Sequence, residues 1–215
     1  MFTAKKLSIL GDSISTYKGV SNDKNANRTT RDNPYYYRPA FELKDTYWQR
    51  IIDDLGMTLC VNNSWSGGNL SGIDDPSSGV NRSSELARDD GETPDVIIVF
   101  MGINDVGRAI DSDKFAFSYN RTLATIKEKY PMAHVCCVNL PDRDIYLKTR
   151  TIIYNNIIKE AALAAGENFF IADLFASRLN NDFYYNNTVD GLHPDRDGMQ
   201  IIAEIIKDAM IANFK

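Results

Sequence analysis

The chain has 215 residues, of which 43% are hydrophobic and 25% are charged, and its formal net charge is −5. This length fits one domain, and the ordinary apolar fraction argues against a disordered chain. The acidic balance argues against a dedicated nucleic-acid-binding protein, because such proteins usually carry a basic face. We therefore expect a single folded domain over residues 1–215, with a core large enough to need no disulfide bonds.

The cysteines and the N-terminal segment indicate which cellular compartment the protein occupies. Cys60, Cys136 and Cys137 are an odd number without the spacing of a disulfide framework, and two of them are adjacent in an apolar run. Buried strand thiols of this kind favour a reducing compartment. Residues 1–6 lack the pattern of a signal peptide, and no segment approaches the roughly 20 apolar residues of a membrane span. We expect a cytoplasmic protein.

Short apolar runs rich in β-branched residues recur along the chain. They occupy residues 6–10, 58–62, 96–101, 135–140 and 169–171. Runs that are apolar on both faces are typical of strands in a parallel sheet that is covered on each side. The sequence therefore predicts about five parallel strands.

Segments with helical periodicity lie between and after these runs. Their apolar stripes predict helices over about 47–55, 115–130, 153–164 and 202–210. Pro131 ends one stripe, and Gly56 and Gly166 stand where helix C-caps are expected. Alternating strands and helices predict an α/β fold, a three-layer α/β/α sandwich with a flavodoxin-like doubly wound sheet.

Three long segments do not fit the alternation: residues 15–45, 66–94 and 174–198. The first two directly follow predicted strands, and the third lies beyond the last strand. Loops at the carboxyl ends of strands line the ligand crevice in open α/β sheets, so we expect these segments to surround a site. The charged residues along 82–92 are interpreted as a solvated face.

Two short motifs at opposite ends of the chain carry possible nucleophile chemistry. Gly11-Asp12-Ser13 directly follows the first apolar run, where a serine can stand exposed above the sheet edge. Asp190 lies three residues before His193, close enough for the carboxylate to orient the imidazole. Read separately, the first is equally an ordinary strand-to-loop turn and the second an Asp-capped turn with a solvated histidine.

Two further motifs supply hydrogen-bond donors. Asn104 lies in the segment Gly-Ile-Asn-Asp after the most apolar run, and Gly67 and Gly68 follow Ser66 after the second run. An asparagine amide and a backbone N–H beside glycine are the donors that an oxyanion hole requires. Each motif alone is also ordinary turn chemistry.

The four motifs occur in the chain order GDS, SGG, GIND and DGLH, and the run DGLHPDRDG over residues 190–198 is especially typical. With them, the sequence resembles the SGNH hydrolases, also called the GDSL esterase/lipase family. The resemblance extends from Gly11 to His193 and into the last predicted helix. It implies a serine hydrolase that needs neither metal nor cofactor.

The resemblance also assigns roles to individual residues. Ser13 would be the nucleophile, His193 the general base and then acid, and Asp190 the residue that orients His193. The oxyanion donors would be the backbone N–H groups of Ser13 and Gly67 and the side-chain amide of Asn104. Gly68 stays open as an alternative to Gly67, because a one-residue shift would exchange them.

Several other residues have weaker claims. His134 opens an apolar strand and is interpreted as a structural histidine, and Asp12 and Asp105 are expected to support their turns. Trp65 and Tyr36 lie in loops near the predicted site and are candidates for substrate binding. The aromatic loop residues could equally pin a long loop in place.

The predicted function is that of a serine esterase that removes a short acyl group, such as acetyl, from a carbohydrate or a similar polar alcohol. A lysophospholipase- or thioesterase-like activity on longer acyl chains is the alternative within the same class. A non-catalytic α/β binding module is the alternative from another class. The alcohol portion, the acyl length and the oligomeric state are not encoded in any motif.

Overall fold

The computed structural model describes residues 2–20, 36, 40–142, 146–176 and 186–214. Its centre is a parallel five-stranded sheet in the order β2-β1-β3-β4-β5. The strands are β1 (Lys6–Gly11), β2 (Thr58–Ser64), β3 (Val96–Phe100), β4 (His134–Val138) and β5 (Phe169–Ala172). This is the flavodoxin-like order, so the predicted fold class is confirmed.

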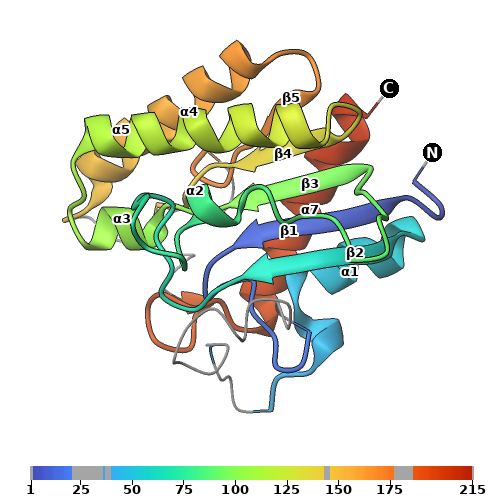
Figure 1. The fold of residues 1–215 in the computed structure, drawn as a ribbon. Helices are drawn as coiled ribbons and strands as arrows, with labels where there is room; N and C mark the ends of the chain where they lie inside the picture. The colour runs from blue at the N-terminus through green and yellow to red at the C-terminus, as the bar shows by residue number, and fades with distance from the viewer. Residues whose placement is uncertain (1, 21–35, 37–39, 143–145, 177–185, 215) are drawn as a thin grey trace.

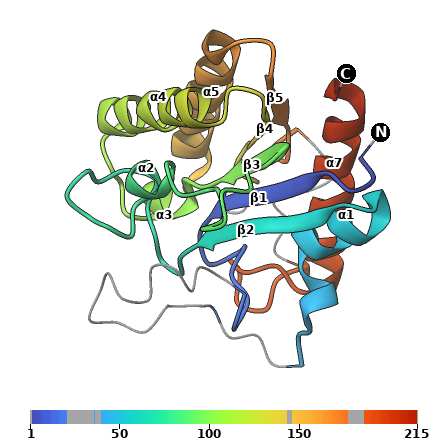
Figure 2. The ribbon, with the colours of Figure 1, turned by 45° about the vertical axis from the view of Figure 1, so that its right-hand side comes forward.

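Helices cover both faces of the sheet (Figures 1 and 2). On one face lie α4 (Ser112–Lys129) and α5 (Lys148–Ala165), and on the other lie α1 (Tyr47–Leu55) and α7 (Arg196–Asn213). The predicted stripes are the buried faces of α4 and α7. On α5 the predicted stripe is wrong: Ile153 is 44% exposed, and the buried face includes Tyr154 and Ile158 instead. Neighbouring residues cap both ends of α1. The Thr46 side chain accepts a hydrogen bond from Gln49 N at its start, and Gly56 ends the helix at φ 65°.

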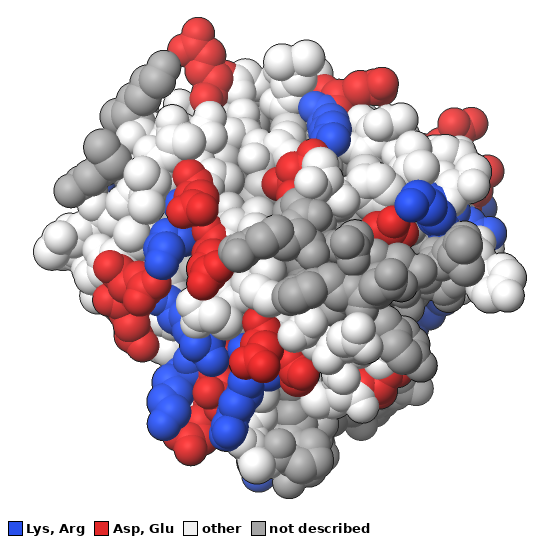
Figure 3. Space-filling model, turned by 180° about the vertical axis from the view of Figure 1, so that it is seen from behind, with Lys and Arg blue, Asp and Glu red and all other residues white. Residues whose placement is uncertain are grey.

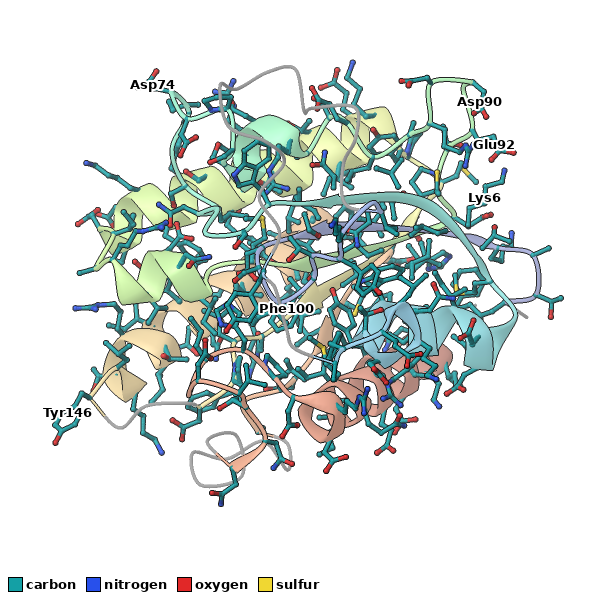
Figure 4. All side chains as sticks on the ribbon, turned by 90° about the horizontal axis from the view of Figure 1, so that it is seen from below. Lys6, Asp74, Asp90, Glu92, Phe100 and Tyr146 are labelled. Carbon is teal, nitrogen blue, oxygen red and sulfur yellow. The ribbon has the colours of Figure 1, made fainter. Side chains whose placement is uncertain are left out.

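The core lies between the sheet and its two helix layers. All five residues of β3 are buried, as expected for a central strand covered on both sides. Figure 4 places Phe100 in the centre of the molecule, whereas Tyr146 projects from the edge and is 93% exposed. Each fully buried aliphatic or aromatic side chain contributes about 1.5–3 kcal/mol, so this layer is the main source of stability. Cys60, Cys136 and Cys137 are buried free thiols within β2 and β4, as predicted.

Short helices were not predicted, two of them within the irregular segments and one directly after β3. They are a 3-10 turn η2 (Leu43–Asp45), α2 (Gly79–Arg82) and α3 (Ile103–Gly107). Segments this short show no helical periodicity in sequence. Their positions matter, because α3 directly follows the Gly102 turn at the end of β3.

The interpretation of residues 82–92 as a solvated face is wrong at Arg82, which is only 1% exposed. Its guanidinium donates to three backbone carbonyls, those of Gly11 (3.0 Å), Ser77 (2.8 Å) and Asn63. Burial lowers the pKa of Arg82 to about 10, and the carbonyls replace the lost water. Arg82 thereby connects the 66–94 segment to the carboxyl ends of β1 and β2.

The amino ends of the strands lie at the opposite side of the molecule from the predicted site. The two termini meet there, with the rings of Phe2 and Phe214 centred 4.5 Å apart (Figure 1). His134 begins β4 at this side, and its ring lies 4.4 Å from that of Phe214. His134 thus lies away from the predicted site, in keeping with its interpretation as a structural histidine.

Charged side chains of both signs intermingle on the face shown in Figure 3. Ion pairs join α1 and its preceding turn to α7, namely Asp54 with Lys207 and Asp45 with Arg196. The Asp54–Lys207 pair is partly exposed and contributes little net stability, about 0–1 kcal/mol, whereas the Asp45 side chain is only 7% exposed. Across the part of the chain that the structure describes, no helix has the length and apolar character needed to cross a membrane.

Candidate active site

The predicted nucleophile lies at the carboxyl end of β1, beside β3. The register pairs Gly11 with Phe100 of β3 and with Ser64 of β2, so the segments that follow all leave the sheet together. This is the point where the strand order reverses, the usual ligand position in such sheets. Gly11 is required sterically, because a Cβ there would lie 2.5 Å from Ser15 Cβ.

Two side chains hold the turn that carries Ser13. Asp12 Oδ1 accepts from Ile14 N at 3.0 Å, and Thr16 Oγ1 donates to the Ser13 carbonyl at 2.9 Å. Asp12 thus supports its turn, as expected. Ser13 itself is 4% exposed.

His193 and Asp190 lie on residues 188–194, which we call the base loop. Its ends are joined by a bridge between Thr188 and Pro194. Asp190 Oδ1 accepts from the backbone N–H groups of Leu192 (3.0 Å) and His193 (2.7 Å). The carboxylate is therefore fixed by its own loop before it meets the imidazole.

The structure brings Ser13, His193 and Asp190 into one line. Asp190 Oδ2 lies 2.7 Å from His193 Nδ1, and His193 Nε2 lies 2.8 Å from Ser13 Oγ. A carboxylate at Nδ1 favours the tautomer that is protonated there, which leaves the Nε2 lone pair directed at the serine hydroxyl. This arrangement can take a proton from Ser13.

The charge on Asp190 is strongly stabilised. Burial alone would raise the pKa of its carboxyl group, but donated hydrogen bonds from the His193 backbone, Tyr36, the His193 ring and the Leu192 backbone hold it well below its usual range. Asp190 is consequently an anion throughout the pH range in which a histidine titrates.

The predicted oxyanion donors lie across the same edge, on residues 66–72, here called the glycine loop, and on α3. Asn104 Nδ2 donates to the Gly68 carbonyl at 2.9 Å, which fixes the side-chain amide beside the glycine loop. Gly68 N donates to the Trp65 carbonyl at 3.0 Å. Gly67 has a φ of 74°, a conformation that favours glycine, and its carbonyl accepts from Arg108 Nη1 at 2.8 Å.

Asp105, on α3, is hydrogen-bonded to the backbone of the glycine loop. Its carboxylate is completely buried and accepts from Leu70 N (2.7 Å) and Ser71 N (3.0 Å). Burial raises the pKa of Asp105, against the lowering effect of these two hydrogen bonds. Asp105 supports its turn, as predicted, and it does so by joining α3 to the glycine loop.

The two aromatic candidates differ in their surroundings. The Tyr36 hydroxyl donates to Asp190 Oδ2 at 2.6 Å, and its ring stacks on the His193 imidazole. Trp65 is 6% exposed at the end of β2, so little of its surface is available to a ligand in this conformation. Tyr35 and Tyr37 lie outside the described residues.

Sequence reasoning missed three features of the site. The buried Arg82, the Arg108 contact with the glycine loop and the contact of Tyr36 with the predicted triad all join residues far apart in the chain. No spacing rule could reveal them. The first two involve backbone carbonyls, which leave no mark in a sequence.

A cavity of about 660 Å³ lies beside the glycine loop, between residues 69–75 and the start of α4. Its lining includes the apolar side chains Ile73, Ile110 and Phe117. Ser13, Asp190 and His193 are not among its lining residues, so the cavity is not part of the predicted triad. Within the described residues, no group of three or more His, Cys, Asp or Glu side chains could hold a metal ion.

Comparison with known proteins adds a family and a fold. The family model of the GDSL-like lipase/acylhydrolases matches residues 5–210, whereas no curated protein matches the chain. A crystal structure from Bacteroides uniformis, described as that of a GDSL-like lipase, is 24% identical with a TM-score of 0.71, over 97% of this chain and 96% of its own.

Two carbohydrate esterases of family 2 have the same fold. The enzyme of Corynascus thermopiles, which also carries a carbohydrate-binding domain, is 19% identical with a TM-score of 0.69, over 99% of this chain and 67% of its own. The enzyme of Clostridium thermocellum in complex with cellohexaose is 18% identical with a TM-score of 0.67, over 99% and 65% respectively. At these identities the likeness establishes the fold alone.

Proposed function

Because the chain belongs to the GDSL-like lipase/acylhydrolase family, we propose that Ser13, His193 and Asp190 form the catalytic triad of a serine esterase. The protein is a carboxylic ester hydrolase, and the finer mechanism is our proposal. The observation that carries it is the continuous line from Asp190 Oδ2 through the imidazole to Ser13 Oγ, with separations of 2.7 and 2.8 Å.

The proposed reaction follows from these positions. Ser13 Oγ attacks the ester carbonyl while His193 Nε2 accepts the hydroxyl proton, and Asp190 stabilises the resulting imidazolium. The tetrahedral intermediate collapses when His193 returns that proton to the leaving alcohol, which leaves an acyl group on Ser13. Water, activated by His193, then releases the acid and restores the serine.

The oxyanion is proposed to bind the backbone N–H groups of Ser13 and Gly67 and the Asn104 amide. Gly67 is preferred over Gly68 because the Gly68 N–H already donates to Trp65 O. In the described part of the chain, no carbonyl accepts from Gly67 N–H. Asn104 has two amide protons, and the hydrogen bond of one to Gly68 O leaves the other to donate to an oxyanion.

For the substrate, we propose a short acyl group, such as acetyl, on a carbohydrate or a similar polar alcohol. Support comes from the low exposure of Ser13 and His193, 4% and 7%, which suits a small acyl group. The polar, glycine-rich composition of residues 66–78 suits a polar alcohol. The shared fold with carbohydrate esterases is consistent with this choice.

One observation favours the alternative of longer acyl chains. The 660 Å³ cavity begins at Asn69, one residue from Gly68, and presents Ile73, Ile110 and Phe117. An acyl chain that passed the glycine loop could lie there. The two substrate classes therefore differ in whether the acyl group enters this cavity.

A panel of p-nitrophenyl acetate, butyrate, octanoate and laurate tests both levels of the proposal. We expect hydrolysis that is highest for acetate and butyrate and is lost in Ser13→Ala. Ser84→Ala, at an exposed position, is the matched control and should behave as wild type. Activity that rises steadily with chain length would replace the short-acyl proposal with the long-chain one. Equal activity in wild type and Ser13→Ala would refute the triad.

A further inference from the structure

We propose that Tyr36 is a positioning residue of the triad, which aligns Asp190 and His193 with Ser13 through its hydroxyl group and its ring. This inference rests on the proposed function, because it presumes that His193 acts as the base. It assigns Tyr36 a role that differs from substrate binding. The residue would act on the reaction through Asp190 and His193.

The first observation is that Tyr36 and His193 share one carboxylate oxygen. Asp190 Oδ2 lies 2.6 Å from the Tyr36 hydroxyl and 2.7 Å from His193 Nδ1. The other oxygen, Oδ1, is held by two backbone N–H groups of the base loop. With donors on both oxygens, the carboxylate cannot rotate without breaking a hydrogen bond. The Tyr36 hydroxyl thus fixes the oxygen that faces the imidazole.

The second observation is a nearly parallel stack. The Tyr36 and His193 ring centroids are 3.4 Å apart, and the ring planes differ by 10°. One face of the imidazole is therefore covered by the tyrosine ring. This contact restricts rotation of His193 about its side-chain bonds and keeps water from that face. When His193 accepts the serine proton, the positive charge lies over an aromatic face that attracts cations.

The third observation is that the Tyr36 backbone is tied to the nucleophile turn. Tyr36 N donates to Thr16 Oγ1 at 2.9 Å, and Thr16 Oγ1 donates to the Ser13 carbonyl at 2.9 Å. One residue is thus bonded on its backbone side to the Ser13 turn and on its side-chain side to the base loop. Because Ser13 and His193 are 180 residues apart in sequence, such a bridge sets their relative position directly.

The contacts make a graded prediction for two substitutions. Tyr36→Phe keeps the stack but removes the hydrogen bond to a charged group, and we expect kcat to fall about tenfold. Tyr36→Leu removes both and should lower kcat about a hundredfold. KM for p-nitrophenyl acetate should stay within about twofold of wild type in both variants, because a positioning residue acts mainly on the transition state.

A double-mutant cycle tests the route of the effect. If the hydroxyl acts through Asp190, Tyr36→Phe should cost less than about twofold in an Asp190→Asn background, against about tenfold in wild type. A purely structural effect on the loop would cost the same factor in both backgrounds. Tyr146→Phe, at the exposed tyrosine that Figure 4 labels, is the matched control and should leave kcat and KM unchanged.

The rate of fluorophosphonate labelling of Ser13 supplies a readout that does not depend on the ester substrate. It should fall in the same order, wild type, Tyr36→Phe, Tyr36→Leu. Circular dichroism melting checks that each variant folds. If Tyr36→Leu fails to fold, Tyr36→Phe and the double-mutant cycle still test the positioning role.

The outcomes separate the two proposals. Loss of all activity in Ser13→Ala with unchanged kcat in both Tyr36 variants would overturn the positioning role alone. A raised KM with unchanged kcat would also overturn it, because Tyr36 would then be a substrate-binding residue. Full activity in Ser13→Ala would overturn the triad and the positioning role together.

Discussion

Two aspartates at the same edge of the sheet, Asp190 and Asp105, are used in opposite ways. Each accepts hydrogen bonds from two backbone N–H groups of a loop. The Asp105 side chain is completely buried and its pKa is raised by that burial. The Asp190 side chain is 39% exposed, and its pKa is held well below the usual range by its donors.

The two carboxylates differ in their hydrogen-bond partners as well as in their depth of burial. Both oxygens of Asp105 accept from the backbone of the glycine loop, so this carboxylate holds a loop in place. Only one oxygen of Asp190 is used in this way, and the other faces His193 and Tyr36. A buried acid with a perturbed pKa is therefore not by itself a catalytic residue, and its hydrogen-bond partners decide its role.

The largest effect that this comparison predicts is on Asp190. In Asp190→Asn, kcat should fall about 10³–10⁴-fold, because the amide favours the wrong tautomer of His193 and cannot stabilise an imidazolium. Steady-state hydrolysis of p-nitrophenyl acetate measures this loss. A fall of less than tenfold in a folded variant would remove Asp190 from the triad.

The second effect concerns the donor that Asp105 helps to position. Asn104→Ala removes one proposed oxyanion donor, and kcat should fall about 10²–10³-fold with KM nearly unchanged. The thermal midpoint, followed by circular dichroism, should stay close to that of wild type, since the amide makes one hydrogen bond to a partly exposed loop. Near wild-type kcat in a correctly folded variant would exclude Asn104 from the oxyanion hole.

Asp105 should show the reverse balance of activity and stability. An asparagine at this position has one oxygen to accept and an NH₂ group that would face a backbone donor. Asp105→Asn should therefore lower the free energy of unfolding by about 1–3 kcal/mol, with a loss in kcat smaller than that of Asp190→Asn. Urea unfolding together with steady-state kinetics separates the two. If Asp105→Asn reduced kcat as strongly as Asp190→Asn at unchanged stability, the division of roles would be wrong.

The smallest predicted effect is that the stability contributions of the two aspartates change in opposite directions as the pH rises. The folded-state pKa of Asp190 is lowered, so its contribution to stability is present above the unfolded value of about 4 and is lost as the pH falls through the folded value. The folded-state pKa of Asp105 is raised, so its contribution is largest below about pH 4 and declines as the pH rises through the folded value.

The stability difference between wild type and Asp190→Asn should therefore grow as the pH rises from about 3 to 7. The difference between wild type and Asp105→Asn should shrink over the same interval. Urea unfolding at several pH values measures both. If both stability differences changed in the same direction with pH, the opposite pKa shifts of the two carboxylates would be wrong.

Much of the fold follows from the sequence because its signals are local. The apolar runs and helical stripes mark every strand of the sheet and the four long helices, and alternation alone indicates a doubly wound sheet. The predicted site residues converge because the carboxyl ends of parallel strands share one edge. Ser13, Gly67 and Asn104 each follow a strand, so the topology places them together without further information.

The remaining features depend on contacts that no local pattern encodes. Arg82 is buried because carbonyls from three segments surround its guanidinium, although its neighbours in sequence are polar and charged. The Tyr36 hydroxyl meets Asp190 across 154 residues of chain. The helices α2 and α3 are too short to show periodicity. Such contacts become visible only when the fold has been assembled.

The central claim is that Ser13, activated by His193, is the nucleophile of this hydrolase. The most direct test is fluorophosphonate labelling followed by tandem mass spectrometry of the peptide from Leu7 to Lys18, which also contains Ser8 and Ser15. We predict that wild type carries the label on Ser13 alone and that Ser13→Ala and His193→Ala remain unlabelled. Label on a different serine, or undiminished labelling of Ser13→Ala, would contradict the account.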